Sequence, residues 1–405
     1  MSNPLSGNLT YIANARFPTE KANGLQVIRM CEAFQDQGVS TTLLHPARHQ
    51  PGALQGVNLF EYYGVRTPFV VKTLSNVDIS RTERWLPHEA FVVAHFAHSA
   101  AWAWYAARFA SRLVPSDLFV TRDITVATAL GLRRLPTVLE LHKAPQRWSL
   151  RLLRDLVTKR RLRLLVTLTA ALRETLISNN VDAKSALVLH DGVDLTRYAV
   201  IAERPWADSL PVVLYSGQLF GEKGIDTLVD AARLLAGDAE IKIVGGMPHH
   251  VKAWRERLEA NGPANVEFLG HLSPERLPAL QKGADVLALP NSGRHLHSAR
   301  YTSPMKLFEY MAAGRPILAS NVTSVGEVLR HGDNAWLVPA DDPLAFAEGV
   351  RTLLLEHDLG ERLASRARAD VQEYTWDIRA RRMLAEAGLG DDHRPRLRDP
   401  QPISH

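Results

Sequence analysis

Short apolar runs alternate with helix-like segments along almost the whole chain, and this alternation constrains the fold more than any other feature. Runs such as 9–14 (LTYIAN), 212–217 (VVLYSG) and 241–246 (IKIVGG) have the length of buried strands, and segments of helical period follow them. Strands that alternate with helices are typical of βαβ units and parallel sheets. The sequence therefore predicts an α/β fold.

The alternation is interrupted once, near the middle of the chain. Residues 199–211 (AVIAERPWADSLP) are polar and contain two prolines, as a linker does. We therefore predict two Rossmann-like doubly wound domains, 1–200 and 201–375, that face each other across a cleft. Residues 390–405 are polar and are expected to form a disordered tail. Ligands of open α/β sheets bind at the carboxyl ends of the strands, so functional residues should lie in loops that follow strands.

Charge, cysteine content and the absence of long apolar runs indicate the cellular compartment of the protein. Residues 1–200 carry a net charge of +9 and residues 201–405 a net charge of −4. The single cysteine, Cys31, excludes an internal disulfide bond and suits a reducing compartment. The N-terminus lacks a signal-peptide pattern, and no apolar run has the length of a membrane span. We expect a cytoplasmic protein.

The loop after the run 212–217 combines a glycine with a lysine. In YSGQLFGEKGIDTL, Gly217 ends a strand and Lys223 precedes a helix. A glycine permits a ligand to approach the backbone, and a lysine at a helix N-terminus adds to its positive field. A plain strand-to-helix turn with a surface lysine is the alternative.

A second strand-end loop lies in YTSPMKLFEYMAAG (301–314). Ser303 is suited to cap a helix, and Pro304 to be its first residue. Lys306 then lies in the first turn, where acids are usually favoured, so we expect an anion such as phosphate there. Glu309 lies one turn later on an apolar face, where ribose hydroxyls would suit a buried carboxylate.

Histidines and glycine motifs narrow the chemistry further. His142 ends the predicted strand 137–142, where it is either structural or a contact to a transferred group. The histidine pairs lack the cysteine or acidic partners of a metal site, so we expect no metal. No G-x-G-x-x-G motif follows a strand, which argues against a nicotinamide or flavin cofactor, and we expect no cofactor.

Taken together, four segments resemble glycosyltransferase family 4, whose members are retaining enzymes with the GT-B fold. They are NGLQVIRMCEAF, HDGVD, YSGQLFGEKGIDTL and SPMKLFEYMAAGRPILAS, and the resemblance extends from about residue 9 to 388. It implies a metal-independent enzyme that binds a nucleotide diphosphate sugar on the C-terminal domain and the acceptor on the N-terminal domain. It also implies that a helix at 376–389 crosses back to the N-terminal domain.

The resemblance assigns roles to single residues. Lys223 grips the diphosphate, and Glu309 holds the ribose. His142 resembles the histidine near the donor sugar, and Gly24 resembles the glycine that lets the phosphates approach. The helix that opens at Ser303 cradles the diphosphate, and its residues are Ser303, Pro304, Met305, Lys306 and Leu307.

Two positions depart from the family pattern. Gln218 stands where many relatives carry an arginine on the phosphates. Tyr301 stands where the family's first motif glutamate contacts the hydroxyls of the donor sugar. These departures leave the donor sugar open and add the alternative of a non-catalytic nucleotide-sugar-binding protein.

The predicted function is glycosyl transfer with retention, from a UDP-sugar or, second, a GDP-sugar to a hydroxyl acceptor in glycan, glycolipid or polysaccharide synthesis. No carboxylate stands out as a nucleophile, so a front-side displacement is expected. Another GT-B enzyme, such as a nucleotide-sugar epimerase or a phosphorylase, is a further alternative. Nucleic-acid binding is not expected, because the basic cluster lacks a recognition motif.

The basic segment 147–161 interleaves arginines with Trp148 and leucines. It could lie on an anionic membrane surface near a lipid-linked acceptor, which would place the protein at the inner face of a membrane. A core-facing amphipathic helix with a charged outer face is the alternative.

Overall fold

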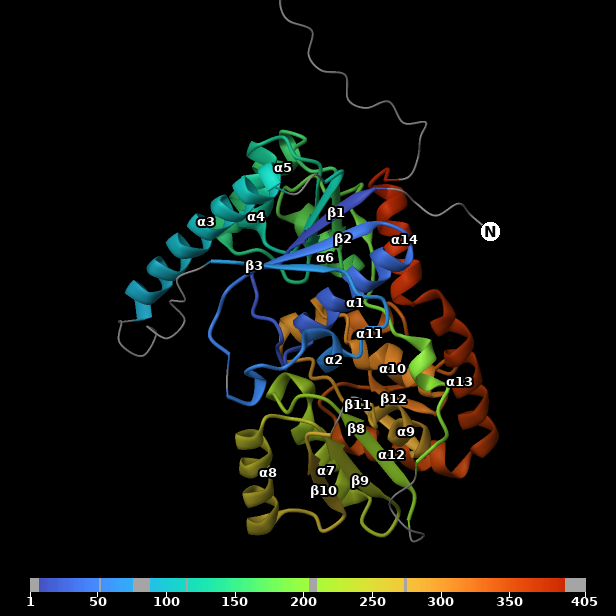
Figure 1. Cartoon of the computed structure of the whole chain (residues 1–405). Helices are drawn as coiled ribbons and strands as arrows, with labels where there is room; N and C mark the ends of the chain where they lie inside the picture. Colours follow the sequence, from blue (N-terminus) through green and yellow to red (C-terminus); the bar gives the residue numbers. More distant parts are fainter. Residues whose placement is uncertain are drawn as a thin grey trace, which may run out of the picture. The chain divides into compact units, whose positions relative to one another are not determined.

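A computed structural model describes residues 7–50, 52–75, 88–113, 116–203, 210–272 and 275–389. Helices cover two parallel sheets, and each sheet is wound in both directions from a central strand (Figure 1). The predicted α/β class and the doubly wound sheets are therefore confirmed. The predicted tail at 390–405 lies outside the described residues.

The first sheet has seven strands in the order β3-β2-β1-β4-β5-β6-β7, and every pairing found is parallel. Its strands are β1 (Asn8–Ile12), β2 (Ser40–Pro46), β3 (Val70–Leu74), β4 (Leu118–Thr121), β5 (Thr137–Leu141), β6 (Leu164–Thr167) and β7 (Leu187–Val188). The helices between them are α1 (Ala22–Asp36), α2 (Leu59–Tyr63), α3 (His88–Leu113), α4 (Ile124–Leu132), α5 (Arg147–Thr158) and α6 (Ala170–Ser178). Short 3-10 turns lie at η1 (Gly52–Leu54) and η3 (Leu195–Tyr198).

The second sheet has six strands in the order β10-β9-β8-β11-β12-β13. Its strands are β8 (Val212–Ser216), β9 (Glu240–Val244), β10 (Val266–Gly270), β11 (Val286–Leu289), β12 (Ile317–Ser320) and β13 (Trp336–Val338). The helices are α7 (Ile225–Leu234), α8 (Pro248–Asn261), α9 (Leu277–Gly283), α10 (Met305–Ala313), α11 (Thr323–Gly326), α12 (Pro343–Leu355), α13 (His357–Asp370) and α14 (Trp376–Glu386). Short turns are η4 (Gly221–Lys223), the π-helical η5 (His297–Tyr301) and η6 (Val371–Glu373).

Alternate side chains of the second sheet pack into two separate hydrophobic cores, one on each face of the sheet. Val213 and Tyr215 of β8 pack with α7, α8 and α12, whereas Leu214 packs with α9, α10 and α11. Successive side chains of a strand point to opposite faces, so both faces of this sheet are covered. This two-faced packing explains why its strands read as continuous apolar runs.

The chain divides into two compact units, of which the first comprises 1–141, 145–166 and 377–405 and the second 142–144 and 167–376. The division at 166/167 differs from the predicted linker at 199–211. Residues after β6 pack on the second unit, where Thr169 Oγ1 donates to Arg300 O (3.1 Å) and two amides of α6 donate to Glu327. Helix α14 falls almost wholly in the first unit, and the roles and the cleft predicted for the two domains stay predictions.

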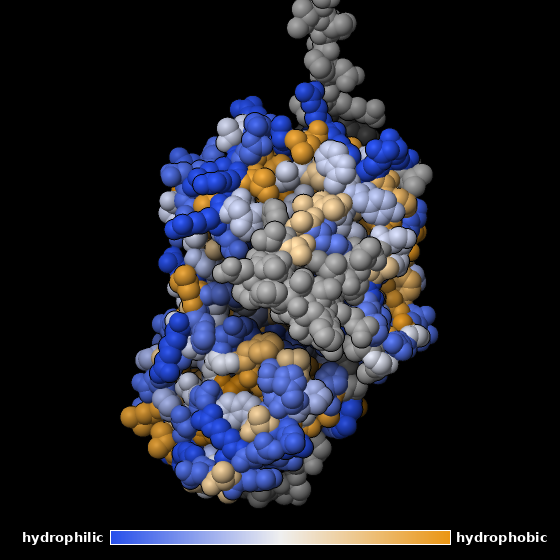
Figure 2. Space-filling model, turned by 90° about the vertical axis from the view of Figure 1, so that its left-hand side faces the viewer, coloured by the Kyte–Doolittle hydropathy of each residue, from blue (hydrophilic) through white to orange (hydrophobic). Residues whose placement is uncertain are grey.

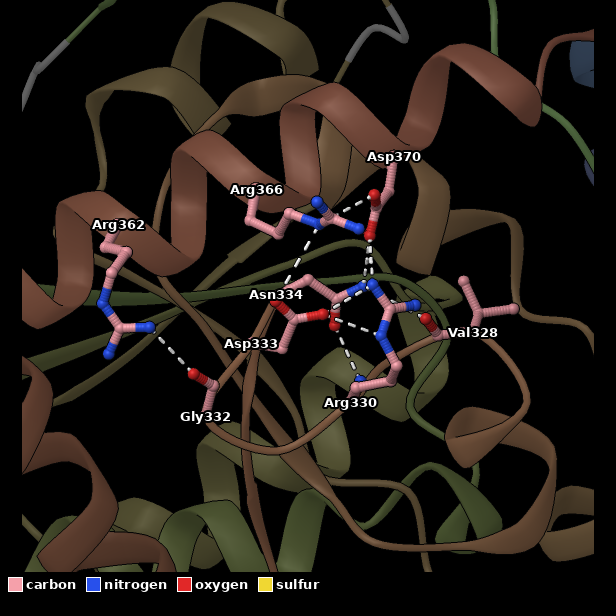
Figure 3. Close-up of polar contacts among 8 residues, drawn as sticks. All are labelled: Val328, Arg330, Gly332, Asp333, Asn334, Arg362, Arg366 and Asp370. Carbon is pink, nitrogen blue, oxygen red and sulfur yellow. Dashed lines mark hydrogen bonds and ion pairs between the residues drawn. The ribbon is translucent and has the colours of Figure 1, made fainter.

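A network of paired charges fixes α13 to the loop before β13 (Figure 3). Arg330 Nη2 lies 2.7 Å from Asp333 Oδ2 and 2.6 Å from Asp370 Oδ2, and Arg366 Nε lies 3.1 Å from Asp370 Oδ1. The buried Asn334 also donates to Asp370 (2.9 Å). Both acids thus face arginines of the chain itself, and we call this group the α13 network.

Candidate functional site

The winding direction of the second sheet changes between β8 and β11. Ligands of open α/β sheets bind at such a switch point, beside the carboxyl ends of the strands. The loop after β8 carries Gly217, Gln218 and Lys223, and α10 carries Lys306 and Glu309. We call this group the strand-end site, and all of it lies in the second unit.

Gly217 is in a backbone conformation that disfavours a side chain, with φ of +145°. A Cβ atom added there would lie 2.6 Å from Lys306 Nζ. Any other residue would therefore displace the lysine. The sequence predicted that a ligand approaches the backbone at Gly217. In the structure, the side chain of Lys306 already lies this close to it.

Lys306 is an unusual cation, because its ammonium is enclosed without a hydrogen-bond acceptor among the described residues. Its Nζ lies 3.7 Å from the centre of the Tyr215 ring and, within the part of the chain that is described, has no hydrogen-bond partner. Burial lowers the pKa of Lys306 well below its ordinary value, Lys223 lowers it further, and Glu309 opposes them. We expected this charge beside the helix N–H groups, whereas it lies on the ring of a strand residue.

Lys223 ends the turn η4 and is half-buried. Its Nζ lies 3.3 Å from Glu222 Oε1, and its charge acts on both Lys306 and His297. Burial lowers the pKa of His297, and Lys223 and Lys143 lower it further, against the opposing effect of Glu222. Several basic groups thus converge on one edge of the sheet.

The start of α10 differs from the prediction. Ser303 does not cap the helix, because its Oγ accepts a hydrogen bond from Asp191 N at 2.9 Å. Pro304 is the N-cap instead, and the helix begins at Met305, which is partly buried. Leu307 is fully buried, with its amide bonded to Pro304 O (2.8 Å). Ser303 therefore ties the HDGVD segment to the helix start.

Glu309 lies in α10 among polar groups that the sequence did not indicate. Burial raises the pKa of Glu309, while Arg197, a hydrogen bond with Gln281 and Lys306 oppose that rise. Gln281 is itself fully buried, donates to Ser216 Oγ (3.0 Å) and accepts from Tyr198 (2.7 Å). The carboxylate is thus held by a buried network beneath the end of β8.

Tyr301 and Gln218, the two departures from the family pattern, have different surroundings. Tyr301 is buried in η5, and its hydroxyl accepts from Thr175 Oγ1 at 3.3 Å. The backbone oxygen of Gln218 accepts from the Tyr215 hydroxyl (2.6 Å), but its side-chain Oε1 is buried without a partner among the described residues, as is Asn291 Oδ1. These two amide oxygens could accept hydrogen bonds from a ligand.

Two further predicted residues, Gly24 and His142, come from other segments of the chain. Gly24 lies in the first turn of α1, in the first unit, where a Cβ atom would lie 2.6 Å from the Tyr63 hydroxyl. Close packing within the chain therefore already requires a glycine there, and its role toward phosphate stays a prediction. His142 follows β5, is half-buried and is assigned to the second unit, and its role near the donor sugar also stays a prediction.

Sequence reasoning missed Tyr215, Arg197, Gln281 and His297, which surround the lysines and Glu309. Only Tyr215 had a usable signal, since it lies two residues before Gly217 on a strand. Arg197 and Gln281 approach from elements remote in sequence. Among the described residues, no group of three or more histidines, cysteines or acids is arranged to hold a metal ion.

The predicted basic segment 147–161 contains α5, whose Leu153 and Leu156 are fully buried. The interpretation as a core-facing amphipathic helix is therefore right, and these two leucines do not face outward. Trp148 stays 43% exposed, between the exposed Arg147 and Arg151. Within the described ranges, no helix combines the length and apolarity needed to cross a bilayer.

Comparison with known families supports the resemblance in the second half of the chain. The family model "Glycosyl transferases group 1" matches residues 210–356, which include the strand-end loop of β8 and all of α10. The phosphatidyl-myo-inositol mannosyltransferase of Mycobacterium leprae is 32% identical over 171 residues, which are 40% of this chain and 42% of that protein.

A second mannosyltransferase and a solved structure extend the comparison. The GDP-mannose-dependent alpha-(1-6)-phosphatidylinositol monomannoside mannosyltransferase of Mycobacterium tuberculosis is 30% identical over 222 residues, 52% of this chain and 57% of that protein. This chain thus spans less than two thirds of either relative. The crystal structure of Anabaena Alr3699/HepE in complex with UDP aligns with a TM-score of 0.69 and 17% identity, over 94% of this chain and 99% of that one. At that identity the likeness concerns the fold, which is GT-B as predicted.

Proposed function

We propose that this chain, whose residues 210–356 belong to the group 1 glycosyltransferases and whose fold is GT-B, is a retaining, metal-independent glycosyltransferase. It moves a sugar from a nucleotide diphosphate sugar to a hydroxyl acceptor. The observation that carries the proposal is the enclosed Lys306 ammonium, beside Lys223 and Gly217, at the switch point of the second sheet. A buried cation without a hydrogen-bond acceptor is unfavourable, and a diphosphate would supply acceptor oxygens together with negative charge.

The proposed reaction is a front-side displacement. The bond between the anomeric carbon and the diphosphate oxygen breaks, and a bond to the acceptor hydroxyl oxygen forms on the same face. The departing diphosphate accepts the proton of that hydroxyl. Lys223 and Lys306 stabilise the negative charge that develops on the diphosphate, which is the kind of fixed electrostatic help that contributes most in enzymes.

UDP-sugar is our favoured donor and GDP-sugar the second. A UDP complex of the structural neighbour supports the first, and the GDP-mannose dependence of a sequence relative supports the second. Glu309 would bind the ribose hydroxyls, because its carboxylate is ionisable, partly buried and fixed by Gln281. Tyr301, whose hydroxyl is engaged by Thr175, supplies no carboxylate to the donor sugar.

A lipid-linked acceptor is part of the proposal, because both relatives are named for phosphatidylinositol acceptors. A peripheral contact with the inner face of a membrane would involve Trp148 and the arginines of α5, without the buried leucines. On the face shown in Figure 2, hydrophobic residues lie in separate groups among hydrophilic ones. At α5 the exposed Trp148 stands between the exposed Arg147 and Arg151, so charge would contribute more to such a contact than insertion.

The first test is a thermal-shift panel of UDP- and GDP-sugars in the presence of EDTA. We expect one of them to raise the unfolding temperature, and its incubation with protein to give slow hydrolysis. A donor that binds but is never hydrolysed would favour the alternative of a non-catalytic binding protein. Tyr301 is the observation behind that alternative, because it replaces a glutamate and its hydroxyl is hydrogen-bonded to Thr175. Conversion of the donor to an epimer would favour an epimerase. A panel without any shift would contradict the proposal.

A further inference from the structure

The first sheet has its own switch point, and an arginine lies at it. The order β3-β2-β1-β4-β5 changes winding direction between β1 and β4. Arg122 directly follows β4, and Asn14 follows β1. By the rule that locates ligands of open α/β sheets, this edge of the first sheet is a binding position of the first unit.

A chain of buried polar groups holds the Arg122 side chain. Its Nη1 donates to Gln26 Oε1 at 2.6 Å and to Asn23 O at 3.4 Å. Gln26 Nε2 donates to Glu140 Oε1 (2.7 Å), and Arg379 of α14 donates to Glu140 Oε2 (3.1 Å). Gln26, Glu140 and Arg379 are each at most 3% exposed. Such a buried network fixes the orientation of the half-buried arginine that it reaches.

The groups that hold Arg122 leave its positive charge without a carboxylate contact. Gln26 and Asn23 offer neutral oxygens, and no hydrogen bond from Nη2 or Nε of Arg122 to any described residue is present. The neighbouring Asp123 is engaged elsewhere, because its carboxylate accepts from Thr125 N (2.8 Å) and Asn14 Nδ2 (3.0 Å). The guanidinium therefore keeps N–H donors that can bind two oxygens of an external oxyanion.

A second arginine lies at the same edge of the sheet. Arg48, which follows β2, donates from Nη2 to Asn14 Oδ1 at 2.5 Å. Strand β1 lies between β2 and β4 in the sheet, so Asn14 links the loops that carry both arginines. The two arginines therefore follow the two strands that flank β1.

We propose that Arg122 binds a phosphate group carried by the acceptor. The inference rests on the proposed glycosyl transfer, since it identifies the acceptor as a hydroxyl compound that also carries a phosphate monoester or diester. Arginine suits this group because its fork of N–H donors matches two phosphate oxygens. Gln26 and Glu140 are positioning residues, which act through Arg122.

The test uses the full chain and inorganic phosphate as the probe, measured by calorimetry. The Lys223→Ala/Lys306→Met double variant is the background, so that phosphate binding at the second sheet is suppressed. We expect this background to bind phosphate, and Arg122→Gln added to it to bind roughly tenfold more weakly or worse, as the loss of a charge-assisted hydrogen bond implies. Arg112→Gln, an exposed arginine of α3, is the matched control and should change nothing.

Three further outcomes are decisive. If Arg122→Gln binds phosphate as tightly as its parent, or if the parent binds none, the proposal is overturned and Arg122 only fastens α1 to β4. Arg122→Lys keeps the positive charge but loses the two parallel N–H donors, so it should bind phosphate with intermediate affinity. This variant replaces Arg122→Gln in the test if the glutamine variant does not fold. In an otherwise unchanged chain, Arg122→Gln should leave the affinity for UDP or GDP unaltered.

An equal loss of nucleotide affinity would assign Arg122 to the donor instead, against the proposal. Failure of the proposed function appears differently. The unchanged chain would then bind no UDP or GDP, while the phosphate measurement on the double variant would still report on Arg122.

Discussion

Two charged regions of the second unit use their cations in opposite ways. In the α13 network, Arg330 and Arg366 lie within 3.1 Å of Asp370, and a second acid, Asp333, lies 2.7 Å from Arg330 (Figure 3). In the strand-end site, Lys306 Nζ has an aromatic ring beside it and, among the described residues, no hydrogen-bond acceptor.

The paired arginines have a structural role, whereas the enclosed ammonium of Lys306 is suited to bind an anionic ligand. An arginine paired by its own chain is satisfied in the free protein and contributes to folding. An enclosed lysine without a partner costs folding free energy, and an anion from outside would recover it. The comparison therefore predicts that variants in the two regions affect different measurements.

The largest effect is expected for Lys223→Ala. Removal of one group that stabilises developing charge should lower turnover by about a hundredfold or more. The unfolding temperature should hardly change, because the partner of Lys223 is the adjacent Glu222. Steady-state kinetics with the identified donor checks this, with the exposed Lys184→Ala as control. A loss of less than about threefold in turnover would remove Lys223 from the mechanism.

Glu309→Gln should weaken the binding of ribonucleotides. A hydrogen bond to a charged group contributes about 1.5–3 kcal/mol, so the affinity should fall by roughly tenfold or more. The shape of the side chain is kept, and its bond to Gln281 can be replaced. Dissociation constants for the nucleotide and its 2′,3′-dideoxy analogue check the assignment. Wild type should prefer the ribose form, and an undiminished preference in the variant would exclude Glu309 as the ribose ligand.

Asp370→Asn should show the opposite pattern, with lost stability and normal kinetics. Although burial opposes it, hydrogen bonds from Asn334 and Arg330 and the nearby arginines lower the pKa of Asp370. The carboxylate thus stabilises the fold above its unfolded pKa, and this contribution is lost as the pH falls through its lowered folded pKa.

Chemical denaturation should show a loss of about 1–3 kcal/mol in the free energy of unfolding of Asp370→Asn. The exposed Asp358→Asn of the same helix is the control. If Asp370→Asn lowered turnover at unchanged stability, the contrast between the two regions would fail.

A smaller effect is expected in the pH dependence of donor binding. Burial and Lys223 lower the pKa of Lys306, while Glu309 opposes them. A diphosphate favours the charged lysine, so binding takes up a proton, and the affinity should fall as the pH rises through that pKa. Titrations with UDP or GDP above about pH 7, where the terminal phosphate of the free nucleotide is ionised, check this. The affinity of Lys306→Met for the nucleotide should depend little on pH. If the affinities of wild type and variant depend equally on pH, the titrating group is not Lys306.

The sequence predicted the sheets well, because their strands are short apolar runs between turn residues. The strand expected at 212–217 is β8 (Val212–Ser216), and that expected at 241–246 is β9 (Glu240–Val244). The small strand β13 was missed, since a strand of this length has little periodicity. The boundary between the compact units was also missed, because it depends on tertiary packing of the segment after β6.

The candidate site was predictable where a residue's role depends only on its neighbours in sequence. Gly217, Lys223, Lys306 and Glu309 follow from strand-end loops and one helix start, and the structure places them in one unit. The cap at Ser303 was wrong because a remote amide, that of Asp191, binds its hydroxyl. Capping rules consider only neighbours in sequence. The contact of Lys306 with Tyr215 escaped prediction for the same reason.

The most direct test of the central claim is the thermal unfolding of wild type and Lys306→Met, each with and without UDP or GDP, in EDTA. The methionine has a similar length and no charge, so the free variant should unfold at a higher temperature than wild type. The nucleotide should stabilise wild type strongly and the variant much less. A free variant that is less stable than wild type, yet gains as much from the nucleotide, would show that Lys306 supports the fold and does not bind the diphosphate.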